Sequence, residues 1–289
     1  MSKKIKHYIE YVLLRIIVLG LRILPLRTSR RIGAGIGRLI SMLLPGRRRI
    51  AEQNLSRVFS DWPREKIREC ARNHFEDMGQ KAVDFFCADR LLAPESPTWL
   101  EISGMEHLEQ AYASGRGVMA VAGHIGMWEL GSLVLSKKGF SIAAVAKPMK
   151  NSRTDAYINR IRSMFGQKIF FTSQAAMRES LRVLKRGEML CLLIDQRPDR
   201  KSAEEIAFLA QSTLVNKGPA MIAAKTGCWV LPSFMVRTGP DTYTLEFTEP
   251  FILEKDKSAL KANLQKMSRV LESRIRMYPE QWLWCHKRW

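Results

Sequence analysis

From about residue 99 onward, short apolar runs rich in Val and Ile alternate with segments whose apolar residues recur at helical spacing. Short apolar runs are typical of buried strands, and strands that alternate with helices are typical of α/β folds. The sequence therefore predicts an α/β sandwich in which helices flank a mixed central sheet. The strands are expected at 117–122, 140–146, 188–194, 228–236 and 243–249, and the helices at 126–137, 152–165, 174–186, 217–226 and 257–277.

The first 30 residues form a separate segment that is both apolar and basic. Residues 11–26 (YVLLRIIVLGLRILPL) are apolar except for Arg15 and Arg22, which lie seven positions apart and so share one helix face. A spanning helix needs about 20 apolar residues, and each arginine near the bilayer centre costs roughly 2.5–3.5 kcal/mol. The pattern fits a helix lying in the membrane interface at least as well as a spanning helix, and a helix docked on the protein's own core is the alternative.

The distribution of charge favours membrane association of this segment. The chain has 47 Lys and Arg residues against 28 Asp and Glu, which gives a formal net charge of +19. Twelve of the basic residues lie in the first 50 positions, where Glu10 is the only acidic residue. Basic residues interleaved with apolar ones suit a membrane surface better than a nucleic-acid-binding arm, and the sequence shows no recognisable nucleic-acid-binding module. We therefore expect the rest of the chain to face the cytoplasm at a membrane, with no nucleic-acid partner.

Residues 31–98 are expected to form a helical lead-in to an α/β domain at 99–289. Gly33, Gly35 and Gly37 superficially resemble a nucleotide-binding loop, but no strand precedes them and apolar residues continue at helical spacing. We interpret them as small residues that allow close helix packing. The five cysteines include no CxxC pair, so the sequence predicts buried thiols and not a disulfide framework or a zinc site.

The strongest candidate for a catalytic site follows the first predicted strand of the α/β domain. His124 stands just after that strand, and Glu129 stands five residues further on. The two side chains can face each other only if the chain turns between them, and Gly126 supplies that freedom. A His–carboxylate dyad of this kind is suited to taking a proton from a hydroxyl that attacks an acyl carbonyl. No second His lies nearby, so the pattern does not favour a metal site.

This stretch resembles the HxxxxD/E motif of the glycerolipid acyltransferase superfamily, and five other segments resemble its branch of bacterial lipid A late acyltransferases. The segments are residues 47–79, 146–166, 192–199 (LLIDQRPD), 216–234 and 279–289 (PEQWLWCHKRW). The last string, with its Trp–x–His–Lys–Arg order, is the most specific of them. One departure is that Phe208, Leu209 and Ala210 stand where the family often has Phe–Phe–Gly.

The resemblance implies an O-acyltransferase of the inner membrane's cytoplasmic face. It would move a fatty acyl group from a thioester of acyl carrier protein, or of coenzyme A, to a hydroxyl of a lipid A precursor, without a metal or other cofactor. The alternative acceptor is another membrane glycolipid or a lysophospholipid.

The resemblance also assigns roles to individual residues. His124 and Glu129 are expected to be catalytic, the His as general base and the Glu as the group that orients it. Arg162, Asp195 and Gln196 are expected to bind substrate. Two roles are open for Arg162, which either grips a phosphate of the acceptor or helps to hold the dyad, and two for Asp195, which either positions the acceptor hydroxyl or pairs with Arg162.

Overall fold

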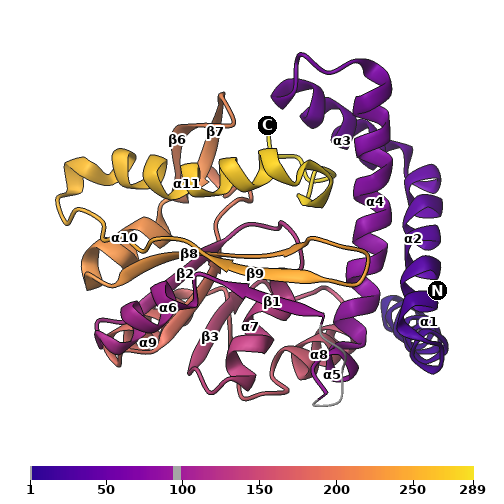
Figure 1. Cartoon of the computed structure of the whole chain (residues 1–289), viewed down its shortest axis with the longest axis horizontal. Coiled ribbons are helices and arrows are strands. Elements are labelled where there is room, and N and C mark those ends of the chain that lie inside the picture. The colour runs from indigo at the N-terminus through magenta and orange to yellow at the C-terminus, as the bar shows by residue number, and fades with distance from the viewer. Residues whose placement is uncertain (1, 94–98) are drawn as a thin grey trace.

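A seven-stranded sheet forms the centre of the computed structural model, which describes residues 2–93 and 99–289 (Figure 1). The strand order is β1–β9–β8–β2–β5–β3–β4, and β1 and β9 run antiparallel to the other five strands. The sheet is therefore mixed, as the sequence predicts. The strands are Leu100–Ser103 (β1), Val118–Ala122 (β2), Ile142–Ala146 (β3), Lys168–Phe171 (β4), Met189–Leu193 (β5), Trp229–Arg237 (β8) and Tyr243–Phe247 (β9).

Helices cover both faces of this sheet, and the side chains of β2 show how. Val118 and Ala120 belong to the apolar cluster that includes α6 and α7, whereas Met119 and Val121 belong to the cluster that includes α9, α10 and α11. In Figure 1, α10 and α11 lie above the sheet and α6 and α7 below it. A strand buried on both faces reads as a continuous apolar run, which is why β2 was predictable. The helices are Met105–Ala113 (α6), Trp128–Lys137 (α7), Ser152–Arg162 (α8), Gln174–Lys185 (α9), Gly218–Thr226 (α10) and Leu260–Met277 (α11).

All five predicted strands and all five predicted helices of this domain are confirmed, within three residues at each end. The sequence pattern did not predict helix α6, nor β1 and β4, which are four-residue edge strands with partly exposed side chains. It also missed a hairpin of β6 (Ala203–Phe208) and β7 (Gln211–Asn216) outside the main sheet. The hairpin turns at Leu209 and Ala210, both with positive φ (52° and 63°), although neither is glycine. A turn without Gly or Asn gives no hairpin signal in the sequence.

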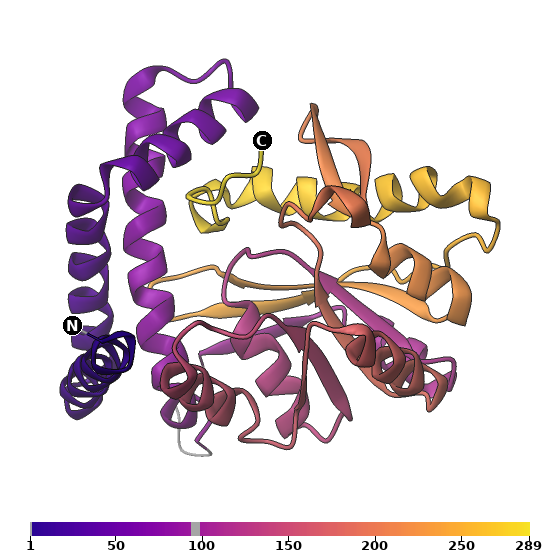
Figure 2. The same ribbon diagram turned by 180° about the vertical axis from the view of Figure 1, so that it is seen from behind.

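The helices that precede the sheet stack at one end of it (Figures 1 and 2). Helices α2 and α4 pack backbone against backbone: a Cβ on Gly33 would lie 2.6 Å from the carbonyl oxygen of Gly79, and one on Gly37 would lie 1.9 Å from that of Phe75. The interpretation of Gly33 and Gly37 as packing residues is confirmed, whereas Gly35 faces open space. The helices are Lys3–Ile23 (α1), Leu26–Leu43 (α2), Pro45–Val58 (α3), Arg64–Phe86 (α4) and Ala88–Leu91 (α5).

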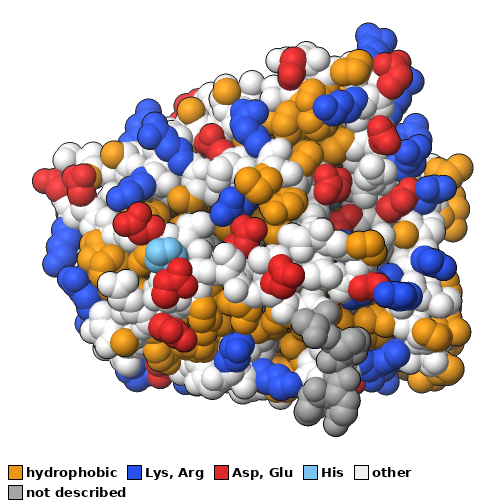
Figure 3. Space-filling model, viewed as in Figure 1, with side chains coloured by type: hydrophobic (Ala, Val, Ile, Leu, Met, Phe, Trp, Pro, Cys, Tyr) orange, Lys and Arg blue, Asp and Glu red, His pale blue; other side chains and the backbone are white. Residues whose placement is uncertain are grey.

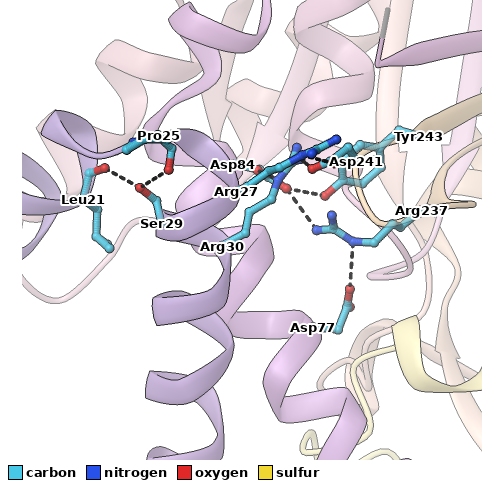
Figure 4. A network of polar contacts seen from close by, with 10 residues as sticks. All are labelled: Leu21, Pro25, Arg27, Ser29, Arg30, Asp77, Asp84, Arg237, Asp241 and Tyr243. Carbon is cyan, nitrogen blue, oxygen red and sulfur yellow. Dashed lines mark hydrogen bonds and ion pairs between the residues drawn. The ribbon is translucent and has the colours of Figure 1, made fainter.

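A buried ionic network docks these helices on the sheet (Figure 4). The carboxylate of Asp84 on α4 accepts hydrogen bonds from Arg30 Nε of α2 at 2.7 Å, from Arg237 Nη2 of β8 at 3.0 Å, and from the hydroxyl of Tyr243 on β9. Arg30 also pairs with Asp241 at 2.9 Å. The expected boundary at residue 30 therefore falls inside a helix that is fixed to the α/β domain.

The outer sides of α1 and α2 expose many large apolar side chains. Ile16, Leu19 and Ile23 of α1 are 61%, 62% and 77% exposed, and Val18 is the one residue described as buried in that helix. Figure 3 shows apolar and basic side chains together along the edge of the molecule formed by these helices. Within residues 2–93 and 99–289, none of the helices is both long enough and apolar enough to cross a membrane. The apolar side chains that α1 and α2 expose are called the α1–α2 apolar surface below: Ile5, Tyr8, Ile9, Leu13, Ile16, Ile17, Leu19, Ile23, Ile32, Ile36, Leu39, Ile40, Met42 and Leu43.

Candidate active site

The candidate site lies where β2 ends and the chain turns into α7. Gly123 follows the strand, and a Cβ at this position would lie 3.0 Å from Asp195 Oδ2 and 2.5 Å from a methyl group of Leu271. A side chain here would therefore push Asp195 away from the next residue, His124. Gly126 adopts a positive φ of 58°, and a Cβ there would collide with the carbonyl oxygen of Met235. The predicted turn at Gly126 is confirmed.

Asp195 is the carboxylate that contacts His124. The Nδ1 atom of His124 lies 2.7 Å from Asp195 Oδ1, and the backbone N–H of His124 donates to Asp195 Oδ2 at 2.7 Å. Two contacts from one carboxylate fix both the backbone and the ring of the histidine. Because an ionised carboxylate only accepts hydrogen bonds, Nδ1 carries the proton and Nε2 is left as the basic nitrogen.

Asp195 is buried and remains ionised. Its carboxyl group also accepts a hydrogen bond from the indole N–H of Trp282 at 2.7 Å. Burial alone would raise the pKa of Asp195, but the neighbouring His124 and these hydrogen bonds hold the pKa below its ordinary value. A charged carboxylate on Nδ1 stabilises an imidazolium when Nε2 takes up a proton.

Gln196 occupies the other side of the imidazole ring. Its side-chain nitrogen lies 3.1 Å from His124 Nε2, and the amide group is exposed. With Nε2 as the acceptor, this contact is a hydrogen bond from the Gln196 amide. A hydroxyl that displaced the amide would meet the basic nitrogen.

Glu129 pairs with Arg162 and not with His124. The guanidinium of Arg162 on α8 donates from Nε to Glu129 Oε2 at 3.0 Å and from Nη2 to Glu129 Oε1, so the pair is bidentate. No hydrogen bond joins His124 to Glu129 in the described part of the chain. The carboxylate that contacts His124 is therefore Asp195 and not Glu129, because β2 and β5 are neighbours in the sheet and their carboxyl ends meet. The expected pairing of Asp195 with Arg162 is likewise absent among the described residues.

These residues surround a pocket of about 370 Å³. Its polar lining residues are His124, Glu129, Ser132, Lys147, Arg162, Gln167, Gln196 and Ser233, and the ring of Trp128 lies edge-on to His124 with centroids 5.0 Å apart. The remaining wall is mostly apolar. It is lined by Ala120, Gly131, Leu135, Ala144, Val145, Ile169, Cys191, Leu192, Leu193, Met235 and Leu245 among others. A lining that combines polar groups beside a basic nitrogen with a mostly apolar wall suits an amphiphile with a hydrocarbon tail.

The C-terminal segment, residues 279–289, contacts this site. Trp282 bonds to Asp195, and the backbone of Ile125 pairs with that of Trp282 in an isolated β-bridge. The carbonyl oxygen of Gln281 accepts from the backbone N–H of Gly126 at 3.1 Å. The sequence marked this segment as specific for a family but gave Trp282 no role. Within residues 2–93 and 99–289, no group of three or more His, Cys, Asp or Glu side chains is placed to hold a metal ion.

Comparison with known proteins identifies relatives along the whole chain. The family model for bacterial lipid A biosynthesis acyltransferases matches residues 1–289. The lipid A biosynthesis lauroyltransferase of Escherichia coli (strain K12) is 26% identical over 277 residues, which cover 92% of this chain and 86% of the relative. The lipid A biosynthesis palmitoleoyltransferase of the same organism is 26% identical over 264 residues, which cover 89% and 83%.

A more partial match is the phosphatidylinositol mannoside acyltransferase of Mycobacterium tuberculosis (strain ATCC 25618 / H37Rv). It is 26% identical over 135 residues, which cover 46% of this chain and 42% of the relative. The family model, by contrast, spans both the helical lead-in and the α/β domain. The chain thus belongs to the bacterial lipid A biosynthesis acyltransferase family and is an O-acyltransferase.

Proposed function

We propose that this protein moves a fatty acyl group from an acyl-thioester directly to a hydroxyl of a lipid A precursor, with His124 as the general base. The observation that carries the proposal is the placement of His124 between Asp195 and the pocket. Asp195 holds the ring with Nε2 turned away from the carboxylate, and Nε2 is the atom a substrate hydroxyl must reach. The family membership supports acyl transfer in lipid A biosynthesis.

The reaction follows from this geometry. The acceptor hydroxyl displaces the Gln196 amide, and His124 Nε2 takes its proton as the oxygen attacks the thioester carbonyl carbon. The charge on the imidazolium is balanced by Asp195. The tetrahedral intermediate then collapses, the C–S bond breaks, and the thiolate leaves with the proton from Nε2. The released amide N–H of Gln196 is available to the oxyanion of that intermediate.

The proposed donor is an acyl-thioester of acyl carrier protein or of coenzyme A. A net charge of +19 attracts an acidic carrier protein and a phosphorylated lipid alike. The acyl chain would lie along the apolar wall of the pocket, and the thioester would lie at its polar end. The bidentate pair of Glu129 and Arg162 then forms a rigid side of the pocket beside the reacting groups.

We further propose that the enzyme works at the cytoplasmic face of the inner membrane, to which residues 1–30 help to attach it. The α1–α2 apolar surface and the basic residues between its members suit an interfacial helix. Flotation with vesicles containing anionic lipid tests this. Ile16→Asp and Leu19→Asp should reduce the bound fraction strongly, whereas Lys261→Asp on the distant helix α11 should have a much smaller effect.

Steady-state kinetics with both substrates varied test the direct transfer. Attack through a ternary complex gives intersecting double-reciprocal lines, and no acyl-enzyme accumulates. Parallel lines, or an acylated protein in intact-protein mass spectrometry, would direct attention to Ser132 or Cys191 in the pocket, or to Ser173. Burial raises the pKa of the Cys191 thiol to about 12, which leaves little thiolate for such a step.

A second candidate acceptor is another membrane glycolipid. The observation that favours it is the partial similarity to the mannoside acyltransferase of Mycobacterium tuberculosis. Mass spectrometry of the lipids from cells with and without the gene distinguishes the two. Loss of one acyl chain from lipid A supports the first candidate, and an unchanged lipid A with an altered glycolipid supports the second.

A further inference from the structure

A second pocket, of about 680 Å³, is strongly basic. It lies between the end of α3, the β6–β7 hairpin and the C-terminal segment. The arginines that line it are Arg57, Arg197, Arg200 and Arg288. Glu205 is the sole acidic side chain among its described lining residues, and it accepts a hydrogen bond from Ser212 in the same pocket. The side chains of the lining therefore carry a formal charge of +3.

Arg288 gives this pocket a fixed, buried cation. The residue is 1% exposed, and its Nη1 atom donates to Thr213 Oγ1 at 2.9 Å and to the carbonyl oxygen of Leu214 at 2.7 Å. The guanidinium carbon lies 5.1 Å from the centroid of the Phe208 ring. Nε and Nη2 have no hydrogen-bond partner among the described residues. Burial lowers the pKa of Arg288 to about 10, although the nearby Asp195 carboxylate opposes this shift, and a bound anion would further stabilise a buried guanidinium with unpaired N–H groups.

The other three arginines of the pocket are exposed. Arg57, Arg197 and Arg200 take part in no ion pair within the part of the chain that the structure describes. Arg162, by contrast, donates from both Nε and Nη2 to Glu129, so it is poorly placed to bind a phosphate as well. The described cations near the site that form no ion pair therefore include Lys147, which lines the active-site pocket, and the exposed arginines of the second pocket.

The chain connects this pocket directly to the reacting histidine. Asp195 and Gln196 contact the two nitrogens of His124, and Arg197, the next residue, lines the basic pocket. Consecutive Cα atoms are about 3.8 Å apart. The loop that contacts His124 therefore continues directly into the lining of the basic pocket.

We propose that this basic pocket binds a phosphate ester group of one of the two substrates while acyl transfer takes place at His124. The proposal rests on the proposed function. Guanidinium forks are donors that phosphate oxygens prefer, and the pocket offers them from its arginines. The phosphate belongs either to the acceptor lipid or to the donor's carrier arm, and the experiment separates these sources.

The test compares Arg197→Gln and Arg200→Gln with Lys201→Gln. Lys201 is exposed, adjoins Arg200 and does not line the pocket, so its substitution removes the same charge from the same region. KM is measured for the acceptor lipid with and without its phosphates, and for acyl-coenzyme A against acyl-pantetheine, which has no phosphate. Losing a charge-assisted contact should raise KM about tenfold or more for the phosphate-bearing member of one pair, with little change for the other member.

The affected pair identifies the source of the phosphate. A loss that is the same with and without phosphate in both pairs, or equal in Lys201→Gln, overturns the proposal.

A binding measurement keeps this test separate from the proposed function. Melting temperatures are compared in inorganic phosphate and in chloride at equal ionic strength, for the wild type, Lys201→Gln and the double variant of Arg197→Gln with Arg200→Gln. Phosphate should raise Tm less in the double variant than in the other two, because a ligand that binds the native state stabilises it. Equal gains in all three overturn the phosphate site. If the wild type transfers no acyl group, the proposed function fails, and this comparison alone decides on the site.

Discussion

Asp195 Oδ1 lies 2.7 Å from His124 Nδ1, across 71 positions of sequence, while its Oδ2 binds the backbone N–H of the same histidine. The contact exists because β2 and β5 are parallel neighbours in the sheet, so the residues that follow them meet at one edge. This edge is where open α/β sheets place their ligands. The pair gives the histidine one defined tautomer and a compensated charge after proton uptake.

Asp195→Asn should lower kcat by about 10²–10⁴ with little change in KM, because an amide at this place favours the wrong tautomer and cannot balance an imidazolium. Steady-state turnover with both substrates saturating measures the effect. The matched variant Glu129→Gln keeps His124 and Asp195 in contact, so its kcat should fall less than that of Asp195→Asn. A larger fall in kcat in Glu129→Gln would show that Glu129, and not Asp195, orients His124.

Glu129 and Arg162 should behave as one unit. Removing either partner leaves the other charge half-buried and unpaired, so Glu129→Gln and Arg162→Met should each reduce transfer. The double variant should be no worse than the poorer single variant, which corresponds to a coupling energy of at least about 1 kcal/mol. Arg162→Met should affect phosphorylated and dephosphorylated acceptors equally. A loss confined to the phosphorylated acceptor would show that Arg162 grips phosphate.

Gly131 on α7 is placed to control which acyl chains fit. It lines the pocket, and a Cβ there would make ordinary contacts of 3.5 Å with Met235 and Leu245. Gly131→Ala should therefore be tolerated, whereas the longer side chain of Gly131→Leu should fill part of the apolar wall. We expect Gly131→Leu to change the ratio of kcat/KM between shorter and longer acyl donors at least about tenfold in favour of the shorter. An unchanged ratio in a folded variant would place the acyl chain elsewhere.

Ala210 stands where the family often has glycine, and its φ is 63°. A left-handed conformation costs a non-glycine residue roughly 1–2 kcal/mol. Ala210→Gly should therefore stabilise the protein by up to about 1 kcal/mol, once the greater freedom of glycine in the unfolded chain is counted. Chemical denaturation measures the free energy of unfolding. Destabilisation by Ala210→Gly would contradict this account of the hairpin turn.

Much of the fold was predictable because buried strands and amphipathic helices leave regular patterns. Edge strands β1 and β4 and the β6–β7 hairpin were not, since short, half-exposed strands and a turn without glycine carry no pattern. His124 was found from its place after a buried strand. The sequence predicts its partner nearby, at Glu129, although Asp195 also follows a predicted strand.

The partnership of His124 with Asp195 depends on which strands are neighbours, and periodicity does not reveal strand order. The signal that was available for Asp195 is that it directly follows a predicted strand, as His124 does. Nothing comparable existed for Trp282 and Arg288, whose contacts depend on how the C-terminal segment folds back over the site and the hairpin.

The turnover of His124→Ala tests the central claim most directly. The His124 side chain is 16% exposed and lies in a loop at the end of β2, so the variant should stay folded and keep the far-UV circular dichroism of the wild type. If His124 is the general base, acyl transfer from an acyl-thioester to the lipid A precursor should fall by at least about 10²-fold in this folded variant. Near-wild-type turnover by folded His124→Ala protein would contradict the account.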